Sequence, residues 1–121
     1  MSNEQNSKPY DLEDRTLEFA RRIREFVKRL PKTIGNIEDG KQLIRSSGSI
    51  GANYIEANEA LSKKDFLMRI KISRKEAKET RFWLRLVDVG ADQALILTRD
   101  DLLKEVLELL KICSSIVAKS V

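Results

Sequence analysis

The lysines and arginines of this chain are concentrated in one segment, residues 63–89. That segment holds nine of them against four acidic residues, a net charge of +5, whereas the rest of the chain holds 14 basic and 15 acidic residues. Five of these cations follow one another at steps of three and four residues, which is the spacing of one helix face. We call them the basic stripe: Lys71, Arg74, Lys78, Arg81 and Arg85.

A stripe of this kind suits the phosphate backbone of RNA or DNA. At a rise of 1.5 Å per residue it is about 21 Å long, and its like charges weaken an isolated helix. Phosphates would turn this repulsion into attraction and release counterions, which makes binding depend strongly on salt. The spacing therefore predicts binding through the nucleic-acid backbone, with base-specific readout much less favoured.

Two features keep a simpler interpretation of the stripe open. Its cations could pair with acids on a neighbouring helix, such as Glu13, Glu25 or Glu105, and form an ordinary solvated face. Aromatic residues that could stack on bases are scarce, because only Phe82 lies at the edge of the stripe and it could equally belong to the core. The sequence is compatible with either use of the stripe.

Residues 45–66, RSSGSIGANYIEANEALSKKDF, raise a second chemical question because they combine glycines, serines and asparagines. A phosphate-binding P-loop needs its Lys and Ser/Thr after the second glycine, and a dinucleotide site needs a preceding strand; neither is present. The apolar and small residues recur at helical spacing instead. We interpret the segment as a helix whose packing face is kept small at Gly48 and Gly51, where close packing must offset about 1 kcal/mol per glycine.

Three polar residues, Ser49, Asn53 and Glu56, share one side of that helix at i, i+4 and i+7. We expect them to form an interhelical or intersubunit hydrogen-bond network, because an orphaned buried polar group costs about 1–3 kcal/mol. A ligand-binding or catalytic carboxylate at Glu56 is the alternative, but neither a general base nor a metal-ligand set accompanies it.

The chain contains no histidine. That absence removes imidazole acid–base chemistry, the Ser-His and Cys-His nucleophile pairs and the usual zinc and di-iron ligand sets. Carboxylate pairs such as Glu76 with Glu79 have i,i+3 spacing, which surface helices commonly contain. We therefore expect a protein that is not an enzyme and that binds no metal and no cofactor.

Four amphipathic helices must position these residues. Apolar residues alternating at steps of three and four predict helices over residues 11–30, 38–61, 63–89 and 99–118. Asp11, Ser62 and Thr98 are suited to begin three of them, and Gly90 to end the third. The seven-residue period and short connectors predict an all-α, up-down-up-down antiparallel four-helix bundle with a left-handed twist.

Composition and length complete this reading of the fold. The chain has 121 residues, enough for one domain, which we place at residues 11–121 behind a flexible N-terminal tail of residues 1–10. No apolar run approaches the roughly 18 residues of a membrane span, and no apolar signal core is present. One cysteine, Cys113, precludes an internal disulfide, so we expect a cytoplasmic protein.

The apolar stripes are wider than a closed four-helix monomer needs, which predicts self-association. The surplus residues lie beside the core positions of the second, third and fourth helices: Ile37, Ile44, Ile55, Ile72, Phe82, Trp83, Leu86, Leu102, Leu109 and Ile116.

Residues 43–86 resemble the bacterial four-helix-bundle family also known as the 23S ribosomal RNA intervening-sequence protein, and the layout agrees over residues 12–117. A Ser-x-x-x-Asn-x-x-Glu core occurs as Ser49, Asn53 and Glu56. A Ser-x-x-Asp-Phe entry occurs as Ser62, Asp65 and Phe66. The Lys-Glu-Ala-x-Glu-Thr-x-x-Trp-Leu signature occurs as Lys75, Glu76, Ala77, Glu79, Thr80, Trp83 and Leu84.

This resemblance implies a four-helix bundle that assembles as a ring, with a pentamer favoured. It also implies kinship with the accessory protein of diversity-generating retroelements, which associates with nucleic acid and a reverse transcriptase. Two functions follow: a homo-oligomer that binds RNA or DNA through the basic stripe, or a scaffolding ring that binds a protein partner and has no nucleic-acid role.

Overall fold

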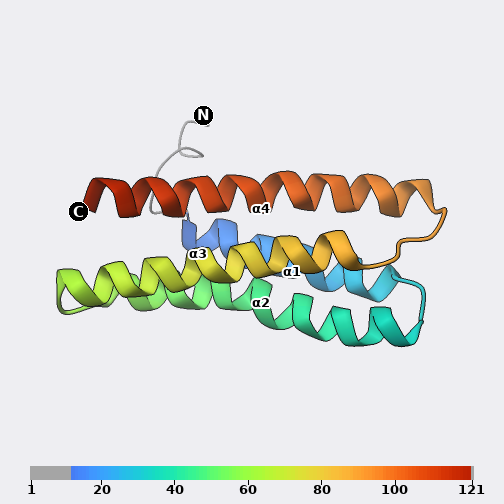
Figure 1. Ribbon diagram of the computed structural model, residues 1–121, viewed down its shortest axis with the longest axis horizontal. Coiled ribbons are helices and arrows are strands. Elements are labelled where there is room, and N and C mark those ends of the chain that lie inside the picture. Colours follow the sequence, from blue (N-terminus) through green and yellow to red (C-terminus); the bar gives the residue numbers. More distant parts are fainter. Residues whose placement is uncertain (1–11, 121) are drawn as a thin grey trace.

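The structure, a computed structural model, describes residues 12–120 and contains four helices. They are α1 (Leu12–Arg29), α2 (Ile34–Asn58), α3 (Lys63–Leu86) and α4 (Gln93–Ser120). Consecutive helices run antiparallel, so the α1–α2 and α3–α4 connectors lie at one end of the bundle and the α2–α3 connector at the other (Figure 1). The up-down-up-down four-helix bundle is confirmed, whereas the left-handed twist and the ring stay predictions.

The core consists of the residues that recur at steps of three and four along each helix. α2 and α3 share the largest contact, and α1 and α4 share the smallest. None of the described helices is long and apolar enough to cross a membrane. The largest fully buried side chains come from all four helices: Phe19, Ile23, Phe26, Leu43, Ile50, Ile70, Thr80, Leu84, Leu95, Leu102, Val106 and Leu109.

The predicted start of the second helix at residue 38 is wrong, because α2 begins one turn earlier at Ile34. Thr33 is its N-cap, with an extended backbone and a side-chain oxygen that accepts a hydrogen bond from the Asn36 backbone N–H at 3.1 Å. The helix ends at Asn58 rather than at residue 61, and Leu61 in the connector is fully exposed. The acids near residue 38 therefore lie inside the first turns and do not begin the helix.

The predicted start of the fourth helix at residue 99 is also wrong. Asp92 takes the capping position, since its carboxylate accepts a hydrogen bond from the Leu95 backbone N–H at 3.2 Å, and α4 begins at Gln93. Burial of Leu95 draws this segment into the bundle. Thr98 lies within the helix, where its hydroxyl donates to the Ala94 carbonyl.

The ends of the third helix follow the sequence more closely. Ser62 is its N-cap and accepts a hydrogen bond from the Asp65 backbone N–H at 3.1 Å, as expected. The helix ends at Leu86, three residues before the predicted position, and Gly90 adopts a positive φ of 66° in the connector. The predicted tail over residues 1–10 and the Asp11 cap lie outside the described residues.

Asn36 joins the two connectors at one end of the bundle. Its side-chain amide donates to the carbonyls of Pro31 at 3.0 Å and Asp88 at 2.8 Å, and its side-chain oxygen accepts from the Asp88 backbone N–H at 3.0 Å. Because Asp88 follows α3, this buried residue fixes where α3 ends relative to α2. Because Asn36 holds the segment that follows α3, it also helps to set the direction in which the outer face of α3 points.

Candidate nucleic-acid interface

The basic stripe lies on the side of α3 that faces away from the core. Ile70, Ala77 and Leu84 are fully buried on the inner side of the same helix. The helical period therefore turns the stripe outward. Four of its residues are exposed and Arg74 is half-buried. The structure thus brings the five predicted residues onto one accessible surface.

None of the five stripe side chains forms an ion pair or a hydrogen bond with any residue from 12 to 120. The three acids that might have neutralised them are engaged elsewhere. Glu13 accepts from Asn58 at 2.9 Å, and Glu25 pairs with Lys28 at 3.0 Å on its own helix. The stripe is therefore a row of cations without acidic partners in the described part of the chain.

The third of those acids, Glu105, forms the ion pair that joins α4 to α1. Its carboxylate accepts two hydrogen bonds from the Arg15 guanidinium, at 2.7 Å and 2.9 Å. The hydrogen bond to Glu105 raises the pKa of Arg15 above its ordinary value, although partial burial acts in the opposite direction. This two-point geometry holds Glu105 at the smallest of the helix contacts, between α1 and α4.

Two of the three acids of α3, Glu76 and Glu79, are directed toward α2. Arg45 of α2 donates to Glu79 at 2.7 Å and to the buried Glu76 at 3.3 Å. Lys75 contributes a longer contact of 3.9 Å to Glu76. Charge is thus separated across α3, with carboxylates beside α2 and unpaired cations facing solvent. Sequence reasoning missed Arg45, because its role depends on how α2 and α3 are rotated relative to each other.

Two buried hydroxyl contacts fix that rotation. Ser73 donates to the Ile50 carbonyl at 2.7 Å, and Thr80 donates to the Ser46 hydroxyl at 2.8 Å. Both hydroxyls are nearly inaccessible to solvent, so each needs a hydrogen-bond partner. Ser73 finds it across the helix contact, and the Thr80 hydroxyl also lies 2.9 Å from the Glu76 carbonyl of its own helix. These residues hold α3 with its basic side outward.

The predicted polar network of Ser49, Asn53 and Glu56 has only one contact across helices among the described residues. Asn53 accepts from Arg69 of α3 at 3.3 Å and donates to the Ser49 backbone carbonyl within α2. Glu56 is exposed, and its carboxylate makes no hydrogen bond or ion pair with a residue between 12 and 120. An intersubunit role for Ser49 and Glu56 stays a prediction.

The two glycines of α2 differ in their surroundings. A Cβ atom on Gly51 would lie 2.6 Å from the Thr16 hydroxyl oxygen of α1, so the absence of a side chain permits this close approach. A Cβ atom on Gly48 would meet nothing within 4 Å in the described chain. The structure therefore gives a packing reason for Gly51, and the expected close contact at Gly48 is not made within the subunit.

Phe82 is 57% exposed and so does not belong to the core, which removes one of the two readings that the sequence allowed. Its ring contacts the half-buried Trp83 in a T-shaped arrangement, with 5.0 Å between centroids and 80° between planes. Leu86, one turn further along α3, is 53% exposed. An aromatic ring and an apolar side chain therefore adjoin the C-terminal part of the basic stripe.

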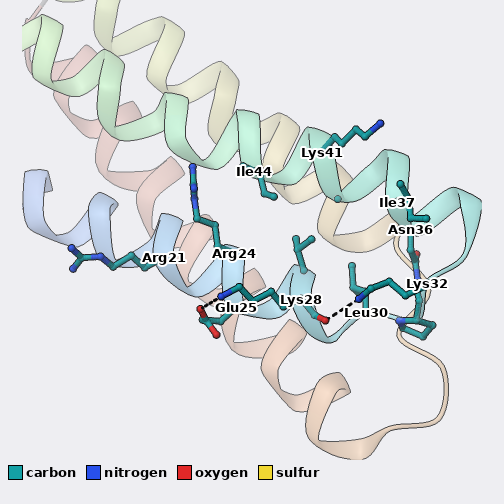
Figure 2. A pocket seen from close by; sticks show the side chains of 13 residues that line it. Arg21, Arg24, Glu25, Lys28, Leu30, Lys32, Asn36, Ile37, Lys41 and Ile44 are labelled. Atoms are coloured by element: carbon teal, nitrogen blue, oxygen red, sulfur yellow. Dashed lines mark hydrogen bonds and ion pairs between the residues drawn. The ribbon is translucent and has the colours of Figure 1, made fainter.

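A second accessible surface lies between α1 and α2. Near the connector it forms a groove of about 580 Å³, lined by Val27, Ile37 and Ile44 among others. Figure 2 shows Arg24 extending from α1 toward α2, and Arg21 pointing away from the groove. Neither arginine forms an ion pair within residues 12–120. The groove combines an apolar floor with a basic rim.

The groove continues toward the other end of the bundle as a hollow of about 540 Å³, which includes Gly48 and Gly51. Leu17 and Ile55, at its margin, are each about half exposed. Of the surplus apolar residues named from the sequence, Leu102 and Leu109 are core residues, whereas Ile37 and Ile55 are exposed here.

No group of three or more Cys, Asp or Glu residues lies close enough to hold a metal ion within the described range. Cys113 is buried, and this burial raises the pKa of its thiol; a weak hydrogen bond to Ser73 and the charge of Arg74 act in the opposite direction. The thiol is therefore a packed core group of α4.

The chain is similar to one protein family and to a protein of known structure. The profile of the 23S rRNA-intervening sequence protein family matches residues 9–116. A crystal structure of a protein of unknown function from the S23 ribosomal protein family of Bacteroides thetaiotaomicron is similar, with a TM-score of 0.73 and 33% sequence identity. The match covers 87% of this chain and 96% of the other. No curated protein matched the chain.

Proposed function

Because the chain belongs to the 23S rRNA-intervening sequence protein family, and the protein in the similar crystal structure is of unknown function, we propose a function from the surface of this chain. The protein binds RNA or DNA through the backbone phosphates, using the basic stripe of α3. It acts without catalysis, as a homo-oligomer in the cytoplasm, and needs no metal or cofactor.

One observation carries this proposal: five cations share one face of α3 and none has an acidic partner within residues 12–120. Like charges at i,i+4 oppose helix formation by about 0.2–0.5 kcal/mol per pair. A fold that keeps such a row, while its own helix directs Glu76 and Glu79 toward Arg45, favours an anionic ligand. The length of about 21 Å suits several successive phosphates.

Backbone contact rather than base readout fits the composition of the helix. α3 contains no Asn or Gln, the residues that pair bidentately with adenine, so among the bidentate base contacts only those of Arg or Lys with guanine are open to it. Lysine and arginine side chains at an exposed helix face reach phosphates in any sequence. We therefore expect affinity that depends on salt more than on sequence.

Self-association supports the same function, because each further subunit adds a stripe and raises avidity. Apolar residues near half exposure, including Leu17, Ile37 and Ile55, give the subunit surface to bury against a copy of itself. The resemblance found in the sequence motifs favours a pentameric ring and kinship with the accessory protein of diversity-generating retroelements. Both are part of the proposal.

A direct test is to purify the protein without nuclease and measure its mass in solution by light scattering together with its 260/280 nm absorbance ratio. The proposal predicts an oligomer that carries nucleic acid, which high salt removes. A particle that stays at the 13.9 kDa of one chain at all concentrations would contradict the assembly. Failure of the cleared protein to bind a structured RNA at micromolar concentration and low salt would contradict the ligand.

The groove between α1 and α2 favours a second candidate function, a scaffolding ring with a protein partner and no nucleic-acid role. Its exposed Ile37 and the neighbouring Ile44 offer an apolar contact that nucleic acid does not need. Pull-down after nuclease treatment separates the candidates, because only the scaffold retains its partner. A partner lost with the nucleic acid would favour the first function.

A further inference from the structure

We propose that the ring of Phe82 stacks on an unpaired base, so that the ligand of the basic stripe is single-stranded or looped nucleic acid rather than continuous duplex. The inference rests on the proposed function, because it names the class of nucleic acid that the same surface takes. It adds one aromatic residue to a site otherwise made of cations.

The surroundings of Phe82 distinguish it from an ordinary exposed apolar residue. Single exposed hydrophobic side chains are common and need no ligand, but this one has Lys78 four residues before it and Arg85 three residues after it. The only acid within one turn along α3, Glu79, is engaged by Arg45 at 2.7 Å. The ring, 57% exposed, therefore lies beside a locally positive surface, with no free carboxylate within one turn along α3.

The contact with Trp83 leaves the ring available for stacking. In a T-shaped pair one ring presents its edge to the face of the other, so the partner covers at most one face of Phe82. With centroids 5.0 Å apart and planes at 80°, at least one face of the Phe82 ring is free of Trp83. The same contact restrains the ring, which lowers the entropy lost when a base binds.

Stacking on a side chain requires a base that is free to leave its neighbours. In a duplex the base faces are covered by adjacent base pairs, and an exposed helix face meets phosphates and groove edges instead. Unpaired bases in single strands and loops can turn outward and stack on aromatic rings while the backbone follows a basic groove. A phenylalanine among phosphate-binding cations therefore has a use with unpaired bases that a duplex does not provide.

The test is an anisotropy titration of a fluorescein-labelled 12-nucleotide RNA, used as a single strand and after annealing to its complement, with a matching DNA pair. The Phe82→Ala variant should bind the single strand about 5- to 150-fold more weakly, which is a stacking energy of about 1–3 kcal/mol converted at 1.4 kcal/mol per factor of ten. Affinity for the duplex should change less than twofold. Phe82→Trp should bind the single strand like the wild type.

Leu86→Ala is the matched control, because Leu86 is 53% exposed on the same helix but has no aromatic ring. It should leave both affinities within twofold. Trp83, the only tryptophan of the chain, gives a second readout: its fluorescence should respond to single strands and not to duplex. The salt dependence of binding should be the same in Phe82→Ala and wild type, because the substitution removes no charge.

The outcomes separate this inference from the proposed function. If wild-type protein binds neither form of RNA or DNA, the proposed function fails, and this inference fails with it. If it binds the single strand and Phe82→Ala binds equally well, the inference is overturned while the stripe keeps its role. If Phe82→Ala lowers the mass of the particle in light scattering, Phe82 is a contact between subunits, and the inference is overturned as well.

Discussion

Arg45 of α2 donates a hydrogen bond of 2.7 Å to Glu79 of α3, on the side of α3 that faces away from the basic stripe. The same guanidinium reaches Glu76 at 3.3 Å. One arginine thereby holds two carboxylates of the basic helix, and Asp65 in its first turn is the third acid of α3. The charge beside the basic stripe beyond that turn is positive. The nucleic-acid surface depends on this residue of a neighbouring helix, which itself lies outside the proposed contact.

Replacing Arg45 with alanine should weaken both folding and binding. Glu76 is buried and would lose its main partner, which we expect to lower the free energy of unfolding by about 1–2 kcal/mol. Freed carboxylates on α3 should also lower RNA affinity several-fold. Urea unfolding and anisotropy measure the two effects. Lys41→Ala is the control, because Lys41 pairs with the exposed Glu38. It should lower the free energy of unfolding by less than about 0.5 kcal/mol, which is typical of an exposed ion pair.

Replacing Asn36 with alanine should loosen the end of the bundle. The substitution removes three hydrogen bonds that tie Pro31 and Asp88 to α2. The part-buried N–H and carbonyl of Asp88 lose these partners, whereas the Pro31 carbonyl keeps the Thr33 N–H at 2.9 Å. We expect a loss of about 2–3 kcal/mol in urea unfolding. Asn58→Ala removes one exposed hydrogen bond to Glu13 and should have almost no effect. Equal losses in the two variants would contradict the role given to Asn36.

Alanine at the two glycines of α2 should act in opposite directions. Gly51→Ala places a methyl group against Thr16, where 2.6 Å is available, and should destabilise the protein by about 1–3 kcal/mol. Gly48→Ala meets open space and should stabilise the helix by about 1 kcal/mol through its higher propensity. Thermal unfolding of the pair measures both. Dissociation of the oligomer by Gly48→Ala would instead place a second subunit at that position.

Cys113 should make stability fall at alkaline pH. Burial raises the pKa of the folded thiol above the ordinary value of 9.0, so above that pH the unfolded chain loses the proton first. The stabilising contribution is fully present below pH 9.0 and is lost as pH rises toward the folded pKa. Urea unfolding from pH 7 to pH 10 should therefore show a steeper decline for wild type than for Cys113→Ala. Parallel declines would contradict a buried, protonated thiol.

Much of the fold follows from patterns within single helices. Four apolar periods and the Ser62 cap predict the bundle and the start of α3, and the spacing of Lys71 and Lys78 predicts an outward basic face. The start of α4 was misplaced because Asp92 competes with Thr98 as a cap, and the burial of Leu95 favours the earlier position. Which of the two residues caps α4 depends on tertiary packing, which cannot be predicted from a local capping pattern.

The candidate site was predictable only in part, for a related reason. Which residues share a side of α3 is a property of its sequence, but whether acids neutralise them depends on relative helix rotation. The bonds from Ser73 and Thr80 set that rotation, and they bring Arg45 to Glu79. Exposure of Phe82 is likewise decided by packing, since its spacing suits either a core or a surface position.

The central claim is that the stripe binds phosphates, and its most direct measurement is the salt dependence of RNA affinity in Arg74→Glu/Lys78→Glu/Arg81→Glu. Wild-type protein should bind a single strand with log K falling by about 3–4 per unit of log salt, from roughly 0.7 per phosphate contact over five contacts. The variant should bind at least 100-fold more weakly at low salt, with a much shallower slope.

The control variant places the same charge change at Arg22, Lys104 and Lys119, which lie on α1 and α4 outside the stripe and outside the groove between α1 and α2. It should keep wild-type slope and affinity within threefold. Equal affinity and slope in the stripe variant and the wild type would contradict the account, as would a loss confined to the control.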